Sequence, residues 1–267
     1  MTPITTTMPG RGKVTAVLLS ELTKLRTVRS TAWTLLSACT VTVLLALCFS
    51  LLSRYASGQL ASGEAADPTG DPVFTSFAGM VLGQLAMVVF GVLAVSGEYS
   101  SGLISTSLHA VPRRGLLLGC KAAVVGGAAL LTGLVTSFTS YAVGQAALGP
   151  YGTSLGEPGV LRAVFGAGLY MALLAVFAMG AATVLRSPLL ALGLLMPFFF
   201  LVSPTLGSLP KTQMVAQYFP DSAGIRIAQV EQMPGALGPW TGLGILVLWT
   251  AVAVAVGVVA LRNRDAR

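Results

Sequence analysis

Charged residues are scarce in this sequence. Asp, Glu, Lys and Arg make up 9% of its 267 residues, whereas a soluble domain carries roughly 25% charged residues to wet its surface. Hydrophobic residues make up 54%, and the mean hydropathy is +0.82. The scarcity of charge excludes an ordinary soluble domain and indicates that most of the protein surface faces lipid.

Metal-ligating and nucleophilic residue types are also scarce. His109 is the only histidine, so no multi-histidine metal site can form within one chain. Cys39 and Cys48 would face opposite sides of one helix, and we expect no disulfide between them or with Cys120. The nearest approach to a phosphate-binding loop, residues 115–121, has the wrong spacing. The sequence therefore predicts no catalytic site, no cofactor and no metal in this chain.

Six apolar runs are long enough to cross a bilayer, which requires about 20 residues. They cover residues 33–53, 73–97, 116–148, 160–185, 189–209 and 240–261, and Pro197 and Pro204 interrupt the fifth. We expect an all-α polytopic membrane domain over residues 31–267, preceded by a disordered tail at residues 1–10.

Residues 11–30 combine apolar and basic side chains at helical spacing. Leu18, Leu22 and Leu25 would share one face, and Lys24 and Arg26 supply charge. This pattern is typical of an amphipathic helix lying in the membrane interface. The alternative is a basic flank of the first span, and the sequence does not decide between the two.

The distribution of basic residues orients the predicted spans. With the N-terminus inside, twelve of the 16 Lys and Arg residues lie in inner segments and four lie in outer segments. The inner set is Arg11, Lys13, Lys24, Arg26, Arg29, Arg113, Arg114, Lys121, Arg186, Arg262, Arg264 and Arg267; the outer set is Arg54, Arg162, Lys211 and Arg226. The positive-inside rule then predicts cytoplasmic termini in a cell membrane. The net charge of +7 fits lipid headgroups in this arrangement, and we expect no nucleic-acid partner.

The spans contain few polar groups. None of the six predicted span cores holds Asp, Glu, Lys or Arg, which disfavours a self-powered carrier. Thr132, Thr136, Thr139 and Ser140 could line a substrate path or make interhelical hydrogen bonds, and we favour the hydrogen bonds. Gly79 and Gly83 favour close helix packing, either within one chain or between two.

The segment after the second span, residues 98–114, is short and amphiphilic. Apolar residues cluster loosely on one side of a helix that Pro112 would end; they are Leu103, Ile104, Leu108 and Val111. Such a surface helix is either a docking element for a partner or a helix lying flat on the inner leaflet.

Several of these segments together resemble one family. Glu98-Tyr99, Gly102, Leu108 and the ending Pro112-Arg113-Arg114 resemble the loop between the second and third spans of type-2 ATP-binding-cassette (ABC) transporter permeases. Residues 20–27 resemble the interfacial helix of these permeases. Residues 218–224, with Tyr218, Pro220, Asp221 and Gly224, are similar to their outer re-entrant segment.

The resemblance implies a permease subunit of an exporter that forms the translocation path. It implies a separate cytoplasmic ATPase that docks on the coupling helix, formed by Glu98, Tyr99, Gly102, Leu103, Ile104, Leu108 and Val111. It also implies a second permease chain, identical or different, and an outer segment that enters the membrane as two short helices. The alternative function is a non-transport membrane anchor or sensor-associated subunit.

Overall fold

The computed structural model describes residues 10–27, 29–60, 71–100, 114–231 and 235–263. Among these residues, six helical segments are long and apolar enough to cross a membrane. The described part of the chain contains no strand. The prediction of an all-α polytopic membrane protein is confirmed.

The spanning segments lie in the same order along the chain as the six apolar runs, although α2 is longer than the predicted first span and α4 begins later than the predicted second one. They are α2 (Arg29–Leu60), α4 (Met80–Ser100), α6 (Arg114–Leu148), α7 (Val160–Leu185), the run of α8 (Pro188–Pro197), η2 (Phe198–Val202) and α9 (Ser203–Ser208), and α12 (Pro239–Asn263). The shorter elements are α1 (Gly10–Thr27), α3 (Pro72–Thr75), η1 (Gly149–Tyr151), α10 (Gln213–Ala216), α11 (Pro220–Gly224) and η3 (Ile225–Ala228). The predicted second span divides into α3, a turn and α4.

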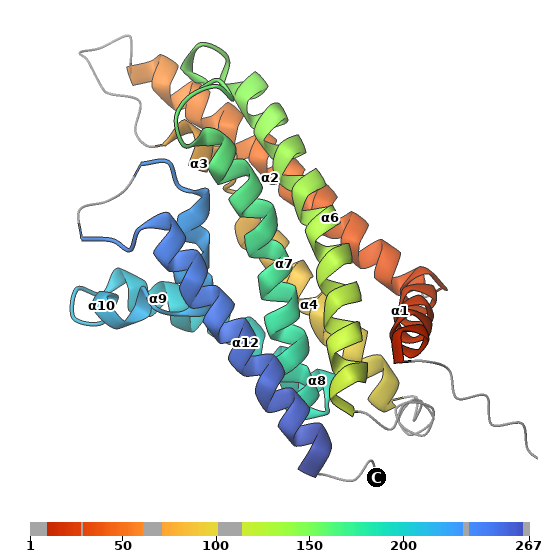
Figure 1. The fold of residues 1–267 in the computed structure, drawn as a ribbon. Coiled ribbons are helices and arrows are strands. Elements are labelled where there is room, and N and C mark those ends of the chain that lie inside the picture. Colours follow the sequence, from red (N-terminus) through yellow and green to blue (C-terminus); the bar gives the residue numbers. More distant parts are fainter. Residues whose placement is uncertain (1–9, 28, 61–70, 101–113, 232–234, 264–267) are drawn as a thin grey trace, which may run out of the picture.

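Helix α7 lies at the centre of the bundle, with α4, α6 and α12 packed around it (Figure 1). In its most apolar window 67% of the residues are buried, against 22% in the first, fifth and sixth spans. Small residues allow the close approach: a Cβ on Gly133 of α6 would overlap the carbonyl of Gly168 on α7. Helix association in lipid depends on such packing, because lipid tails are as apolar as the helices.

The Gly-x-x-x-Gly pair in the second span packs within the chain. A Cβ on Gly79 would overlap the backbone carbonyl of Thr42 on α2, and one on Gly83 would overlap the Thr42 side chain. The Thr42 hydroxyl donates to the carbonyl of Ala38, 2.6 Å away on the same helix. Of the two roles that the sequence allowed for this pair, the structure shows the intramolecular one.

The connection between the fourth and fifth spans is as short as the sequence predicts. Arg186 ends α7 in the left-handed conformation, with φ of 56°. Ser187 caps α8 by accepting from the amide of Leu190, and Pro188 occupies the first helical position, where its missing N–H is not needed. The fifth span then changes to a π-helix after Pro197, as expected for a helix interrupted by proline.

Two ends of the bundle are named for reference below. The terminal end holds α1, the start of α6 and the C-terminal end of α12 (Figure 1). The opposite end holds α3 and η1. Cys39, Cys48 and Cys120 are all free.

Candidate functional site

Helix α1 is attached to the bundle at the terminal end. Val17 packs with Leu117 and Cys120 of α6, and all three side chains are buried. Glu21 lies one helical turn after Val17 and therefore faces the same side, toward α6. One side of the predicted amphipathic helix is thus covered by α6.

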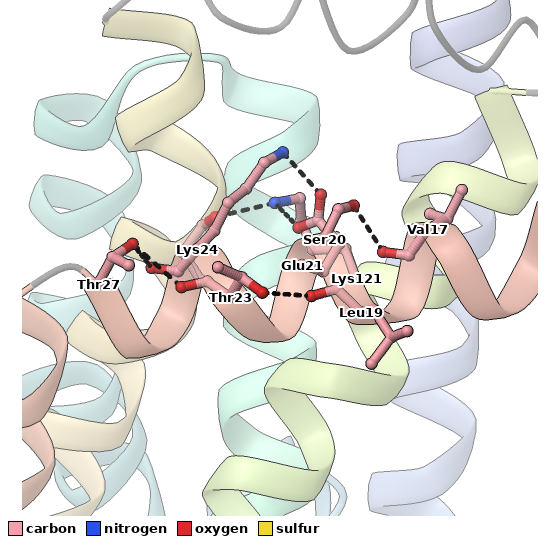
Figure 2. Close-up of polar contacts among 9 residues, drawn as sticks. Val17, Leu19, Ser20, Glu21, Thr23, Lys24, Thr27 and Lys121 are labelled. Carbon is pink, nitrogen blue, oxygen red and sulfur yellow. Dashed lines mark hydrogen bonds and ion pairs between the residues drawn. The ribbon is translucent and has the colours of Figure 1, made fainter.

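A buried cluster of charges completes this attachment (Figure 2). The Lys121 ammonium of α6 donates to one Glu21 oxygen at 2.6 Å, and Lys24 donates to the other at 2.7 Å. Lys121 also donates to the carbonyl of Ala94 on α4, 3.4 Å away. Glu21 and Lys121 are only 3% and 5% exposed. One lysine therefore joins α1, α4 and α6.

The residues predicted for the interfacial helix have different surroundings. Leu18 packs against the cluster around Val17, and Leu25 packs against the main core. Leu22 is exposed, at 39%, and Lys24 is half-buried in the ion pair with Glu21. Arg26 lies in the last turn of the helix. The sequence places Lys121 among the inner basic residues but gives no signal that it pairs with Glu21.

The predicted docking segment begins directly beside this cluster. Glu98 and Tyr99 form part of the last turn of α4, four and five residues after Ala94. Gly102, Leu103, Ile104, Leu108 and Val111 lie outside the described residues. The charge cluster therefore joins α4, which precedes this segment in the sequence, to α6, which follows it.

The hydroxyl groups of the third span do not gather on one surface. Thr136 and Ser140 are buried and Thr132 is half-buried, whereas Thr139 is exposed. The Thr136 hydroxyl donates to the carbonyl of Thr132 on its own helix at 2.7 Å. Among the described residues, the buried Ser140 hydroxyl has no hydrogen-bond partner. The favoured interhelical hydrogen bonds are therefore absent at Thr136 and Ser140.

The segment before the last span enters the bundle. Gly224 of α11 lies so close to α7 and α12 that a Cβ there would overlap the side chains of Tyr170 and Leu246. Tyr170 lies ten residues after the start of α7, which is about 15 Å along the helix. Pro220, Asp221 and Gly224 are buried, whereas Tyr218 is exposed and its carbonyl accepts from the Trp249 indole at 2.9 Å.

Asp221 corrects an expectation drawn from the sequence. It lies in the connection between the fifth and sixth predicted spans, yet its side chain is only 7% exposed. The lack of Asp, Glu, Lys and Arg in the predicted span cores suggested that no acidic group lies within the bundle. The carboxyl of Asp221, on the short helix α11, is nevertheless buried there. Hydropathy of the spans could not show this, because Asp221 belongs to a connecting segment.

Two pairs of polar residues lie in the part of the bundle that Asp221 enters. Tyr170 of α7, which packs against Gly224 of α11, donates to the Gln84 amide oxygen of α4. The Ser203 and Ser222 hydroxyls lie 3.0 Å apart beside the carboxyl. One Asp221 oxygen has no hydrogen-bond partner among the described residues. Burial raises the pKa of Asp221 above its ordinary value, although the Ser203 hydroxyl and the amides of Ser222 and Asp221 oppose the rise.

A second acid holds the re-entrant segment at the opposite end. Asp71 caps α3 by accepting from the amides of Val73 and Phe74 at 2.9 and 3.2 Å. Its other oxygen accepts from the amides of Val230 and Glu231 at 2.7 and 3.2 Å. Asp71 thus contacts residues that lie roughly 160 positions later in the sequence. The Asp-Pro pair at a helix start signals a cap, but nothing in the sequence signals the second contact.

Few His, Cys, Asp and Glu side chains lie near one another in the described ranges. No group of three or more His, Cys, Asp or Glu side chains there is placed to hold a metal ion. No known protein-family model matches the chain, and no curated protein matches it significantly.

Proposed function

We propose that this chain is the permease subunit of an ABC-type exporter in the cell membrane, driven by a separate cytoplasmic ATPase. The observation that carries the proposal is the attachment of α1 to α4 and α6 through Glu21 and Lys121, beside the residues that follow α4. The order of segments that resembles type-2 permeases is the second support.

A permease driven from outside the membrane needs a stiff connection between its docking segment and its spans. Helix α4 leads into residues 101–113 and α6 leads out of them. Lys121 and the Ala94 carbonyl join these two helices, and Glu21 adds α1 to the same unit. A displacement of the docking segment would then move α1, α4 and α6 together, because a buried ion pair is costly to separate.

The re-entrant segment would close the path at the other side. Helix α11 lies between α7 and α12 and contacts both near Tyr170 and Leu246. It is held by Asp71 through Val230 and Glu231. Movement of α7 or α12 during transport would displace α11 and so open or close the path. With the termini cytoplasmic, as the basic residues predict, the re-entrant segment lies toward the outer side of the membrane.

A second permease chain would complete the path. The fifth span exposes large apolar side chains along much of its length, and the most exposed are Leu189, Leu190, Leu194, Phe200 and Leu201. We propose that a second chain, identical or different, covers part of this surface. Lipid would cover the remainder.

Association with an ATPase tests the proposal. The chain is co-expressed with a candidate ABC ATPase from the same genome, and the complex is purified and reconstituted. Glu98→Ala and Leu108→Ala should each weaken ATPase capture and abolish stimulation of ATP hydrolysis. Lys211→Ala, at an exposed position of the α9–α10 connection, is the matched control and should change neither.

Two results would contradict the proposal in different ways. Unchanged capture by both variants would show that residues 98–108 are not the docking site. Normal capture by the wild-type chain with no stimulation and no transport would favour the alternative, a membrane anchor.

A further inference from the structure

An apolar groove opens on the surface of the bundle between α6, α7, α12 and η3. Its volume is about 400 Å³, within the range of small-molecule sites. Leu130 and Leu134 of α6 form one wall, and Trp240 of α12 lies on another side. Arg162 of α7 is the charged residue in its lining.

The floor of the groove is closely packed. Gly166 has no side chain, and a Cβ there would overlap Ile227, which fills the space and is only 1% exposed. Phe165 leans on Phe138 of α6 in an edge-to-face contact, with ring centroids 5.1 Å apart. The groove therefore exists before any ligand binds, which lowers the entropic cost of binding.

Arg162 lies at one end of the groove with donors to spare. Its two terminal nitrogens donate to the carbonyls of Ile227 and Gln229 at 3.3 and 3.0 Å. A guanidinium has five N–H donors, so these two bonds leave capacity for an anion. Among the described residues no carboxylate forms an ion pair with Arg162. Asp71 acts on it only at longer range, with its oxygens already accepting backbone amides.

The groove has the dimensions and direction of a lipid chain. Arg162 is the third residue of α7 at the opposite end, and Leu169 lies seven residues deeper, or about 10 Å. One leaflet of the hydrocarbon core is about 15 Å thick. Phe165 and Trp240 are 49% and 69% exposed beside the groove, and aromatic residues are typical of the membrane interface.

We propose that this groove binds one phospholipid, with an acyl chain between α6 and α7 and the phosphodiester on Arg162. The charge at the end of an otherwise apolar groove matches a molecule with one anionic head and an apolar chain. The assignment does not depend on the transport function, and it holds whichever side of the membrane the termini occupy. The bound lipid would join η3, and with it the re-entrant segment, to α6 and α7.

Native mass spectrometry tests the groove. The chain is purified in detergent and incubated with phosphatidylglycerol of defined chain length. Wild type should retain one lipid above the background of non-specific adducts. Leu130→Trp, which fills the groove, should abolish retention of that lipid. Leu131→Trp, on the neighbouring residue that is 68% exposed, is the matched control and should retain it. Equal retention by the two variants would overturn the proposal.

Tryptophan quenching tests the role of Arg162. In a chain carrying Trp33→Phe and Trp249→Phe, the fluorescence of Trp240 is titrated with phosphatidylglycerol that has brominated chains. Quenching should saturate at one lipid per chain, and Arg162→Gln should raise the concentration required about tenfold, as expected for loss of a charge-assisted bond. Diacylglycerol with the same brominated acyl chains lacks the phosphate. It should bind wild type more weakly than phosphatidylglycerol does, and it should bind wild type and Arg162→Gln equally. Equal quenching of wild type by the two lipids would show that Arg162 does not recognise phosphate.

Discussion

Lys121 donates to Glu21 over 2.6 Å although 100 residues separate them in the sequence. Both side chains are buried, so neither charge is solvated by water. Helix α1 is therefore fixed to α6 by an interaction that is costly to break. In the proposed permease, this is the contact through which α1 would follow the spans.

The first prediction concerns this ion pair. Glu21→Gln leaves the Lys121 ammonium buried without its carboxylate and should destabilise the protein by about 3–5 kcal/mol. The double variant Glu21→Leu, Lys121→Met should recover most of this loss, because a buried pair replaced by apolar side chains is often close to neutral. Thermal unfolding in detergent measures both. Lys24→Gln, which removes the more exposed partner of Glu21, is the control and should cost less than about 1 kcal/mol. Equal destabilisation by Glu21→Gln and Lys24→Gln would contradict the assigned burial.

The second prediction concerns the packing of α4 on α7. A Cβ on Gly91 would overlap the backbone carbonyl of Ala175, which cannot move aside as a side chain can. Gly91→Ala should therefore destabilise by about 1–3 kcal/mol. Gly127→Ala, on α6 with open space around it, should be neutral or stabilise by up to about 1 kcal/mol through helix propensity. Unfolding in the same detergent compares the two, and a stabilising Gly91→Ala would refute the close contact.

The third prediction concerns pH. Burial raises the pKa of Asp221 above its ordinary value of 3.8, so between these two pKa values the folded protein binds more protons than the unfolded chain. The contribution of Asp221 to stability is then fully present below about pH 3.8, and it is lost as the pH rises through the pKa that Asp221 has in the folded protein. Asp221→Asn should flatten this part of the profile of melting temperature against pH. Glu157→Gln, at an exposed carboxyl, should retain the wild-type slope. An unchanged slope in Asp221→Asn would show that another group titrates.

The fourth prediction concerns sidedness. In a background without Cys39, Cys48 and Cys120, a cysteine at Glu157 should react with an impermeant maleimide on intact cells, because this residue is exposed between α6 and α7. A cysteine at Asn263 should react only after permeabilisation. The reverse pattern would invert the assigned topology. Position 221 is unsuitable for labelling because its side chain is buried.

Most of the span boundaries follow from the sequence. The fourth span was predicted at 160–185 and α7 covers the same residues. The signal is strong there because flanking loops rich in glycine, proline and charge end a continuous apolar run. The second span is less well predicted, since Asp71 and Pro72 start a short helix, α3, that an unbroken apolar run does not reveal.

The contacts of the candidate sites could not be predicted in the same way. Glu21 and Lys121 have no sequence pattern that joins them, and Asp71 meets Val230 across most of the chain. Asp221 lies between two spans in the sequence, and only the packing of α11 against Tyr170 and Leu246 places it inside the bundle.

The sequence by itself therefore determined that the chain is an all-α membrane protein and where its spans lie, since both depend on local runs of apolar residues. Only the tertiary structure decided which charges are buried, which acid enters the bundle and where a groove remains beside Arg162. The physical reason is that hydropathy acts along the chain, whereas the pairing and desolvation of charges depend on helices that the sequence places far apart.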